Sequence, residues 1–290
     1  MKTIAVICFD RPLLTNECLD SLFAAAEIDN FYKILIFQKG NKEVQKIVEN
    51  HRNSFNFVVE VERAGNATQN INANRYLAYS IAFENLYSDY LIVLEDDVQI
   101  SFDALFFADR VFDKYCDDRM FRAYNFGSGV KRNPSLYNSY SKVRYGLQGP
   151  ASLLPRKSWE HFDKKVLEKK SKYEIFDGTF ETYIQSGFVI MPNNSRYVDN
   201  GYNGTHALSY ESTDYFKKLE SSWVGLEKID LNVPFKRNIS LNWRIDCIAY
   251  KRSHDPYFYV RNFIVFHRER FLIGTLLKVY RTIKKLLTKP

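Results

Sequence analysis

Three adjacent carboxylates, Glu95, Asp96 and Asp97, directly follow the apolar run Tyr90–Leu94 (YLIVL). Neighbouring carboxylates repel one another, so this acidic triplet is best explained by a divalent cation that neutralises it. Hard oxygen ligands select Mg²⁺ or Mn²⁺, and such an ion can bridge the phosphates of a nucleoside diphosphate and stabilise it as it leaves. The acidic triplet therefore predicts a metal and nucleotide site. An acidic turn at the end of a strand is the alternative.

A second candidate is Arg11, which with Asp10 follows the apolar run Thr3–Phe9. An arginine at this point can pair with a phosphate at the edge of a sheet. A solvated arginine in a loop explains the same pattern equally well.

The elements that must position these residues alternate between strands and helices. Apolar runs predict strands at Thr3–Phe9, Lys33–Phe37, Phe57–Val61 and Tyr90–Leu94, and helical periodicity predicts helices after an N-cap at Thr15, at Glu43–His51 and at Asn72–Tyr87. This alternation is typical of a doubly wound, Rossmann-like, mostly parallel sheet flanked by helices, which binds ligands at the carboxyl ends of its strands. Arg11 and the acidic triplet are both predicted at such ends.

Beyond residue 100 the pattern is less regular. A helix is predicted at Phe102–Tyr115 and strands at Arg122–Phe126 and Gly187–Met191, whereas Gly127–Gln148 and Asn193–His206 are predicted as loops. No repeat or linker divides the chain. We therefore expect one large domain, 1–267, with a nucleotide-binding half at about 1–100 and an acceptor half at about 101–267.

The net charge of +7 is concentrated near the end of the sequence. Residues 268–290 hold seven basic residues and one acidic residue, so the preceding 267 are almost neutral. A nucleic-acid-binding protein usually spreads its charge over a face of the domain, and nucleic acid is therefore not expected as a partner. Leu272, Leu276, Tyr280, Ile283 and Leu287 follow helical spacing opposite several basic residues. This pattern predicts a basic amphipathic helix on an anionic membrane surface; packing of its apolar face on the domain is the alternative.

Four cysteines without a CxxC spacing give no sign of a zinc site. No signal peptide and no apolar stretch of membrane-spanning length are recognisable. These features predict a cytoplasmic protein, peripheral on the cytoplasmic face of a membrane.

Four segments together resemble the N-acetylglucosaminyltransferase I family of GT-A fold, inverting glycosyltransferases. They are Val6–Leu22 (VICFDRPLLTNECLDSL), Tyr90–Gln99 (YLIVLEDDVQ), Phe176-Asp177 and Ser195–His206 (SRYVDNGYNGTH), and the resemblance covers roughly residues 4–216. It implies that Asp97 binds the metal, that Glu95 and Asp96 contact the ribose and the donor sugar, and that Arg11 lies near the nucleotide or its phosphates. It also implies that Asp177 is the catalytic base, and that Thr205 and His206 belong to a lid over the donor.

Physical reasoning also favours a carboxylate such as Asp177. Inverting transfer needs a base that takes the acceptor's proton on the face of the sugar opposite the metal. Asp177 precedes Gly178 at a break in the pattern, and Glu181 is a competing candidate. The sequence departs from the family at Gln38, where an acidic residue would recognise the base, and near Asn72 and Asn74, where a donor-contacting histidine would stand.

The sequence thus predicts an inverting, metal-dependent transferase. It would move a sugar from a nucleotide-sugar, with a UDP-sugar expected, to a saccharide or lipid-linked saccharide during surface polysaccharide or oligosaccharide assembly. The enzymatic alternative is a sugar nucleotidyltransferase, although the Cys8–Pro12 loop lacks the glycines that such enzymes carry after the first strand. A non-catalytic, membrane-surface carbohydrate-binding protein is the other alternative.

Overall fold

The computed structural model describes residues 1–62, 67–128, 137–143, 150–160, 187–201, 220–228, 230–231 and 235–237. The chain divides into two compact units, Met1–Asp246 and Cys247–Pro290. Every described residue belongs to the first unit, so the helix predicted within 268–290 lies outside them. The domain boundary expected after residue 267 stays a prediction.

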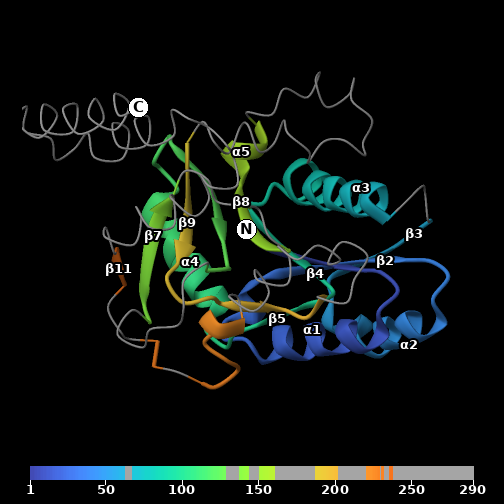
Figure 1. The fold of residues 1–290 in the computed structure, drawn as a ribbon. Coiled ribbons are helices and arrows are strands. Elements are labelled where there is room, and N and C mark those ends of the chain that lie inside the picture. The colour runs from blue at the N-terminus through green and yellow to red at the C-terminus, as the bar shows by residue number, and fades with distance from the viewer. Residues whose placement is uncertain are drawn as a thin grey trace, which may run out of the picture. The chain divides into compact units, whose positions relative to one another are not determined.

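The described part of the first unit is built on one large sheet, in the strand order β11-β7-β9-β6-β8-β4-β1-β2-β3 (Figure 1). Its strands are β1 (Lys2–Cys8), β2 (Tyr32–Gln38), β3 (Phe57–Val61), β4 (Tyr90–Glu95), β6 (Phe121–Asn125), β7 (Ser139–Val143), β8 (Ala151–Pro155), β9 (Phe188–Pro192) and β11 (Lys236–Arg237). β3, β2, β1 and β4 run parallel, whereas β8 is antiparallel to both of its neighbours, β4 and β6. β9 is parallel to β6, and β7 is antiparallel to β9.

Helices flank the sheet on both sides. They are α1 (Pro12–Ala24), α2 (Lys42–His51), α3 (Ala67–Ser80, which continues as the π-helix η3, Ile81–Asn85), α4 (Ala104–Tyr115) and α5 (Arg156–Glu160), with short 3₁₀ turns η1 (Ile28–Asn30) and η2 (Arg52–Ser54). α1 and α2 pack together below the parallel strands in Figure 1, and α3 crosses on the other side, against β1, β2 and β4. The predicted α/β class, with a mostly parallel sheet flanked by helices, is confirmed.

The central strands are buried on both faces because helices cover both faces of a parallel sheet. Residues Ile4–Cys8 of β1 have no exposed surface, and Tyr90–Leu94 of β4 is also buried. A strand in this position can carry apolar side chains in unbroken succession, and this is why the predicted runs match β1, β2 and β4 to within one residue at either end. β3 lies at the edge of the sheet and is partly exposed, but its predicted bounds are also correct.

The first helix begins three residues earlier than Thr15, the expected N-cap. Pro12 is its first residue, and Arg11 is the N-cap. Proline suits this position because its fixed φ is helical and the amide hydrogen that it lacks would be unpaired there. The helix start at Pro12 places Arg11 at the point where β1 turns into α1.

Both predicted loops contain a strand. Gly127–Gln148 includes β7, and Asn193–His206 includes β10 (Tyr197–Asp199), which pairs in antiparallel fashion with β5 (Val98–Ile100). The composition of β7 is polar, but its hydroxyls are satisfied: Ser141 Oγ donates to Asn193 Oδ1 at 2.6 Å, and Asn193 Nδ2 donates to Ser139 Oγ at 2.7 Å. These bonds allow serine side chains to be buried in a strand where polarity alone predicted a loop.

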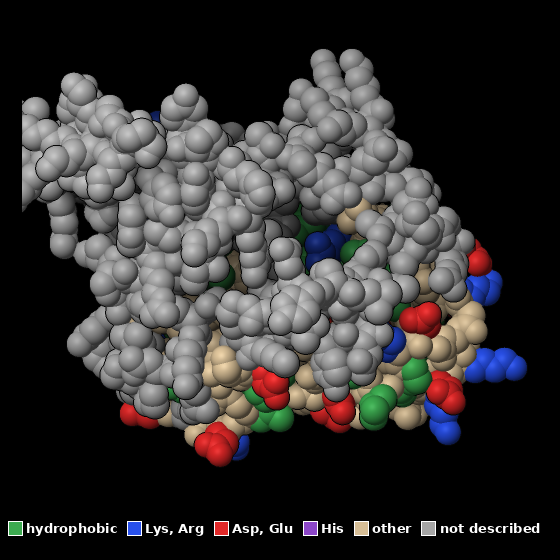
Figure 2. Space-filling view, in the orientation of Figure 1, with side chains coloured by type: hydrophobic (Ala, Val, Ile, Leu, Met, Phe, Trp, Pro, Cys, Tyr) green, Lys and Arg blue, Asp and Glu red, His purple; other side chains and the backbone are tan. Residues whose placement is uncertain are grey.

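The described surface around α1 and α2 carries acidic and basic side chains intermixed. Figure 2 shows both red and blue groups along the lower and right-hand edges, with no large area of one charge among the described residues in that view. Within the described part of the chain, no helix has both the length and the apolar character needed to cross a membrane.

Candidate functional site

The acidic triplet lies at the carboxyl end of β4, beside the carboxyl end of β1. Ile7 of β1 is level with Glu95 of β4 in the parallel register, and Cys8 is level with Phe37 of β2. The loops that follow β1, β2 and β4 therefore meet at one edge of the sheet, where α/β proteins bind ligands. The structure brings Arg11, Glu95, Asp96 and Asp97 together, as the sequence predicted.

Asp96 is fully buried and is hydrogen-bonded to the loop after β1. Its Oδ2 accepts hydrogen bonds from the backbone amide of Phe9 at 2.7 Å and from Thr15 Oγ1 at 3.4 Å, and its Oδ1 accepts one from Arg11 Nη2 at 2.6 Å. Burial raises the pKa of this carboxyl to about 6 even though Arg11 opposes the shift. Asp96 thus fixes the loop and the guanidinium.

Asp97 is paired on one oxygen only. Arg11 Nη1 donates to its Oδ2 at 2.7 Å, whereas its Oδ1 is buried without a hydrogen-bond partner among the described residues. Burial and the nearby Glu95 raise the pKa of Asp97. A buried carboxylate oxygen without a donor is costly unless something outside the protein binds it.

Glu95 is held by Arg75, which comes from α3 on the opposite side of the sheet from α1. Arg75 Nη2 donates to Glu95 Oε1, and both side chains are largely buried. Arg75 was not among the site residues predicted from the sequence. A lone arginine within an amphipathic helix gives no signal that its partner is an acid at the end of a strand.

A fourth carboxylate, Asp199, was also missed. Antiparallel pairing places Asp199 opposite Val98, which directly follows the acidic triplet, and the amide of Asn200 donates to the carbonyl oxygen of Asp97 at 2.8 Å. The carboxylate accepts a 2.8 Å hydrogen bond from the amide of Gly201. Burial, then the negative charge of Asp97, raises the pKa of Asp199 to about 8.

Among the described side chains of the acidic triplet, its two arginine partners and Asp199, negative charges exceed positive ones by two when all are ionised. Four carboxylates, Glu95, Asp96, Asp97 and Asp199, face two guanidinium groups, Arg11 and Arg75. No group of three or more acidic, histidine or cysteine side chains surrounds one point among the described residues. Mg²⁺ and Mn²⁺ at nucleotide sites typically use one or two carboxylates and complete their shell with water and phosphate oxygens. The free oxygen of Asp97 and the excess charge fit such an ion.

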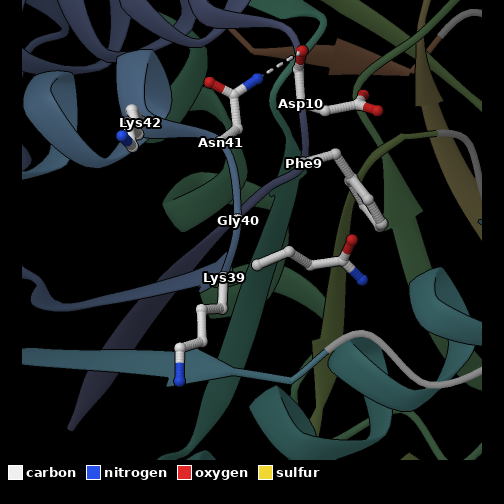
Figure 3. Close-up of a pocket in the computed structure, with 7 residues that line it drawn as sticks. Phe9, Asp10, Lys39, Gly40, Asn41 and Lys42 are labelled. Carbon is white, nitrogen blue, oxygen red and sulfur yellow. Dashed lines mark hydrogen bonds between the residues drawn. The ribbon is translucent and has the colours of Figure 1, made fainter.

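A cavity of about 540 Å³ opens next to the triplet, between the ends of β1 and β2. It is lined by Phe9, Asp10, Gln38, Lys39, Gly40, Asn41 and Lys42. Figure 3 shows Asn41 bridging the two loops, with its Nδ2 donating to the carbonyl oxygen of Asp10 at 3.1 Å. The same side chain caps α2 by accepting from the amides of Glu43 and Val44. Asn41 thus fixes the wall of the cavity.

Gln38 supplies an unused donor in this cavity. Its side chain is 7% exposed, and its Nε2 has no hydrogen-bond partner among the described residues. A buried donor without a partner costs free energy, and an acceptor atom of a ligand would remove that cost. The other predicted site residues, Asp177 with its competitor Glu181, Thr205 and His206, lie outside the described residues.

No protein-family model matches the sequence, and no curated protein matches it. Among solved structures, similar folds include Staphylococcus aureus TarS 1–349, with 13% identity over 70% of this chain and 61% of TarS 1–349 and a TM-score of 0.46. They also include the mannosyltransferase PcManGT from Pyrobaculum calidifontis, solved with GDP-Man and Mn²⁺, with 13% identity over 100% of this chain and 81% of that one and a TM-score of 0.49.

A cytidylyltransferase from Leptospira borgpetersenii is similar at 16% identity, with 79% and 100% coverage and a TM-score of 0.43. The chain spans less than two thirds of the TarS structure named above. At such identities and TM-scores the likeness does not define an activity, which must be argued from the site itself.

Proposed function

We propose that this protein is a metal-dependent glycosyltransferase of the GT-A type that takes its sugar from a nucleotide-sugar donor. The observation that carries the proposal is Asp97, whose Oδ1 is buried without a described partner at the carboxyl end of β4. The excess negative charge around it calls for a cation, and the adjoining cavity has room for a nucleoside. The resemblance of four sequence segments to N-acetylglucosaminyltransferase I supports the same assignment.

Asp97 would hold the divalent cation, Mn²⁺ or Mg²⁺. When bound, such an ion neutralises the charge that develops on a departing nucleoside diphosphate. Glu95, kept in place by Arg75, would face the donor sugar. Arg11 lies close enough to the triplet to bind a phosphate as well. The resemblance implied that Asp96, with Glu95, contacts the ribose and the donor sugar. Because the side chain of Asp96 has no exposed surface, its role would instead be to position Arg11.

The nucleoside would occupy the cavity between β1 and β2. The amide of Gln38 offers both a donor and an acceptor, which suits the adjacent carbonyl and N–H groups of a base such as uracil. A UDP-sugar is therefore the first donor to test. Gln38 replaces the family's acidic residue without losing the ability to recognise a base.

Four parts of the proposal rest on the sequence alone. Asp177, with Glu181 as the alternative, would be the base of an inverting reaction, and Thr205 and His206 would belong to a lid. The acceptor would be a saccharide or lipid-linked saccharide of surface polysaccharide synthesis. Residues 268–290 would bind an anionic membrane surface, which vesicle flotation of the full chain and of a 1–267 truncation can test.

The sugar nucleotidyltransferase alternative is less well supported. The described loop between β1 and α1 is Phe9-Asp10-Arg11, which contains no glycine to bring the backbone close to a triphosphate. The proposal is tested by incubating the full chain with nucleotide sugars and Mn²⁺ and measuring release of the nucleoside diphosphate. Asp97→Asn should abolish it, and the matched control Asp29→Asn, an exposed acid in η1, should leave it unchanged.

Other results of these assays would favour a different function or contradict the metal site. Release of pyrophosphate from a nucleoside triphosphate and a sugar phosphate would favour the nucleotidyltransferase. Absence of any nucleotide-dependent thermal shift in the wild type would favour a non-catalytic protein. Diphosphate release that persists in Asp97→Asn at the wild-type rate would contradict the proposed metal site.

A further inference from the structure

The acidic triplet is joined to a segment far away in the sequence. β5 starts directly after Asp97, and β10 pairs with it so that Asp199 lies opposite Val98. The amide of Asn200 then donates to the carbonyl oxygen of Asp97 at 2.8 Å. Backbone pairing therefore fixes the position of Asp199 relative to Asp97.

The contacts of Gly201 show how close the carboxylates of Asp97 and Asp199 are to each other. A Cβ on this residue would clash with Oδ2 of Asp97 and would lie 3.0 Å from Oδ1 of Asp199. These contacts place Oδ1 of Asp199 about 5 Å or less from Oδ2 of Asp97, the oxygen that Arg11 also binds. Two oxygens on opposite sides of one Mg²⁺ are ~4 Å apart. Only a glycine leaves the space between the carboxylates open.

The described cations do not balance this pair. Arg11 is engaged by Asp96 and by Oδ2 of Asp97, and Arg75 is engaged by Glu95. Among the described residues no lysine or arginine forms an ion pair with Asp199, while Oδ1 of Asp97 has no partner. Two buried carboxylates at this separation repel each other, and either a proton on one of them or a cation near both relieves the repulsion.

We propose that Asp199 is a second carboxylate ligand of the divalent cation held by Asp97. The inference rests on the proposed function, because it assigns another residue to the same metal site. It has a structural consequence: the ion joins the Tyr197–Gly201 segment to the acidic triplet. Cation binding would therefore stabilise that segment before any nucleotide arrives.

The test measures binding of Mn²⁺ alone to the full chain, from the EPR signal of the free ion. Asp199→Asn keeps the shape and the acceptor for the Gly201 amide but removes the charge, and it should weaken Mn²⁺ binding at least tenfold. Glu17→Gln is the matched control. Glu17 accepts hydrogen bonds from Gln99 at 2.8 Å and from Asn200 at 3.5 Å, so it contacts the same two segments, and its loss should change Mn²⁺ affinity less than twofold.

A second readout follows the segment itself. Mn²⁺ should slow hydrogen exchange of the Asn200 and Gly201 amides in the wild type and in Glu17→Gln but not in Asp199→Asn. If Asp199→Asn binds Mn²⁺ like the wild type while Asp97→Asn does not, the inference is overturned and the proposed metal site stands. If neither substitution weakens binding, or the wild type binds no Mn²⁺, the metal site of the proposed function fails as well.

Discussion

Arg11 and Asp97 are joined by a hydrogen-bonded ion pair, with Nη1 of the guanidinium 2.7 Å from Oδ2 of the carboxylate. The same guanidinium reaches Asp96 through Nη2 at 2.6 Å. Arg11 therefore connects the end of β1 to two acids at the end of β4, and the geometry of the candidate site depends on it.

Replacing Arg11 should destabilise the protein even when no ligand is present. Arg11→Ala leaves the fully buried Asp96 without its charged partner, and removal of one member of a buried pair typically costs about 3 kcal/mol. Chemical denaturation in the presence of a chelator measures this. Arg52→Ala, which removes an exposed pair with Glu49, should cost less than about 0.5 kcal/mol. Equal costs for the two variants would contradict the burial argument.

The stability of the metal-free protein should decrease as pH rises through the range in which Asp199 titrates. The pKa of this carboxyl is raised from 3.8 to about 8, so the folded state binds a proton more tightly than the unfolded state. Stability is then highest below the unfolded value and is lost as pH approaches the folded value.

Between about pH 6.5 and 8.5, above the raised pKa of Asp96, the expected loss is at most about 2 kcal/mol. Denaturation with a chelator at both pH values measures it. Asp199→Asn should remove most of the pH dependence. A wild-type stability that is flat or rises over this interval would show that Asp199 is ionised throughout.

Gln38→Leu should weaken donor binding without weakening the fold. The substitution removes a buried amide whose Nε2 has no described partner, so the free energy of unfolding should change by less than about 1 kcal/mol. Loss of a hydrogen bond to the base should reduce nucleotide-sugar affinity about tenfold, since a hydrogen bond to a buried group contributes roughly 1 kcal/mol or more. Titration calorimetry measures the affinity. Gln45→Leu on α2, outside the cavity, is the control, and equal affinities in the two variants would remove Gln38 from the base site.

Arg75→Met should have opposite effects on two measurements. It leaves Glu95 without its buried partner. The free energy of unfolding, measured in the presence of a chelator, should therefore fall by about 3 kcal/mol. The substitution also increases the negative charge around Asp97 by one, which should strengthen Mn²⁺ binding several-fold. Weaker Mn²⁺ binding in this variant would indicate that Arg75 is needed for the shape of the site more than for its charge balance.

Strands β1, β2 and β4 could be predicted from the sequence because they are largely buried on both faces. β1 and β4 carry apolar residues in unbroken succession, and that pattern requires no knowledge of a partner strand. β7 and β10 were missed for the opposite reason. The serine hydroxyls of β7 are buried only because Asn193 bonds them, and β10 exists only through its pairing with β5.

The sequence by itself determined the acidic triplet, Arg11 and the sheet edge at which they meet, because residues next to a strand end are placed by that strand. Only the tertiary structure decided which acids act together and which cations oppose them. The antiparallel pairing of β10 with β5 places Asp199 beside the acidic triplet, and α3, on the other side of the sheet from α1, places Arg75 against Glu95. Charge balance in a buried site depends on distances between segments that are remote in the chain, and no local pattern of residues encodes such distances.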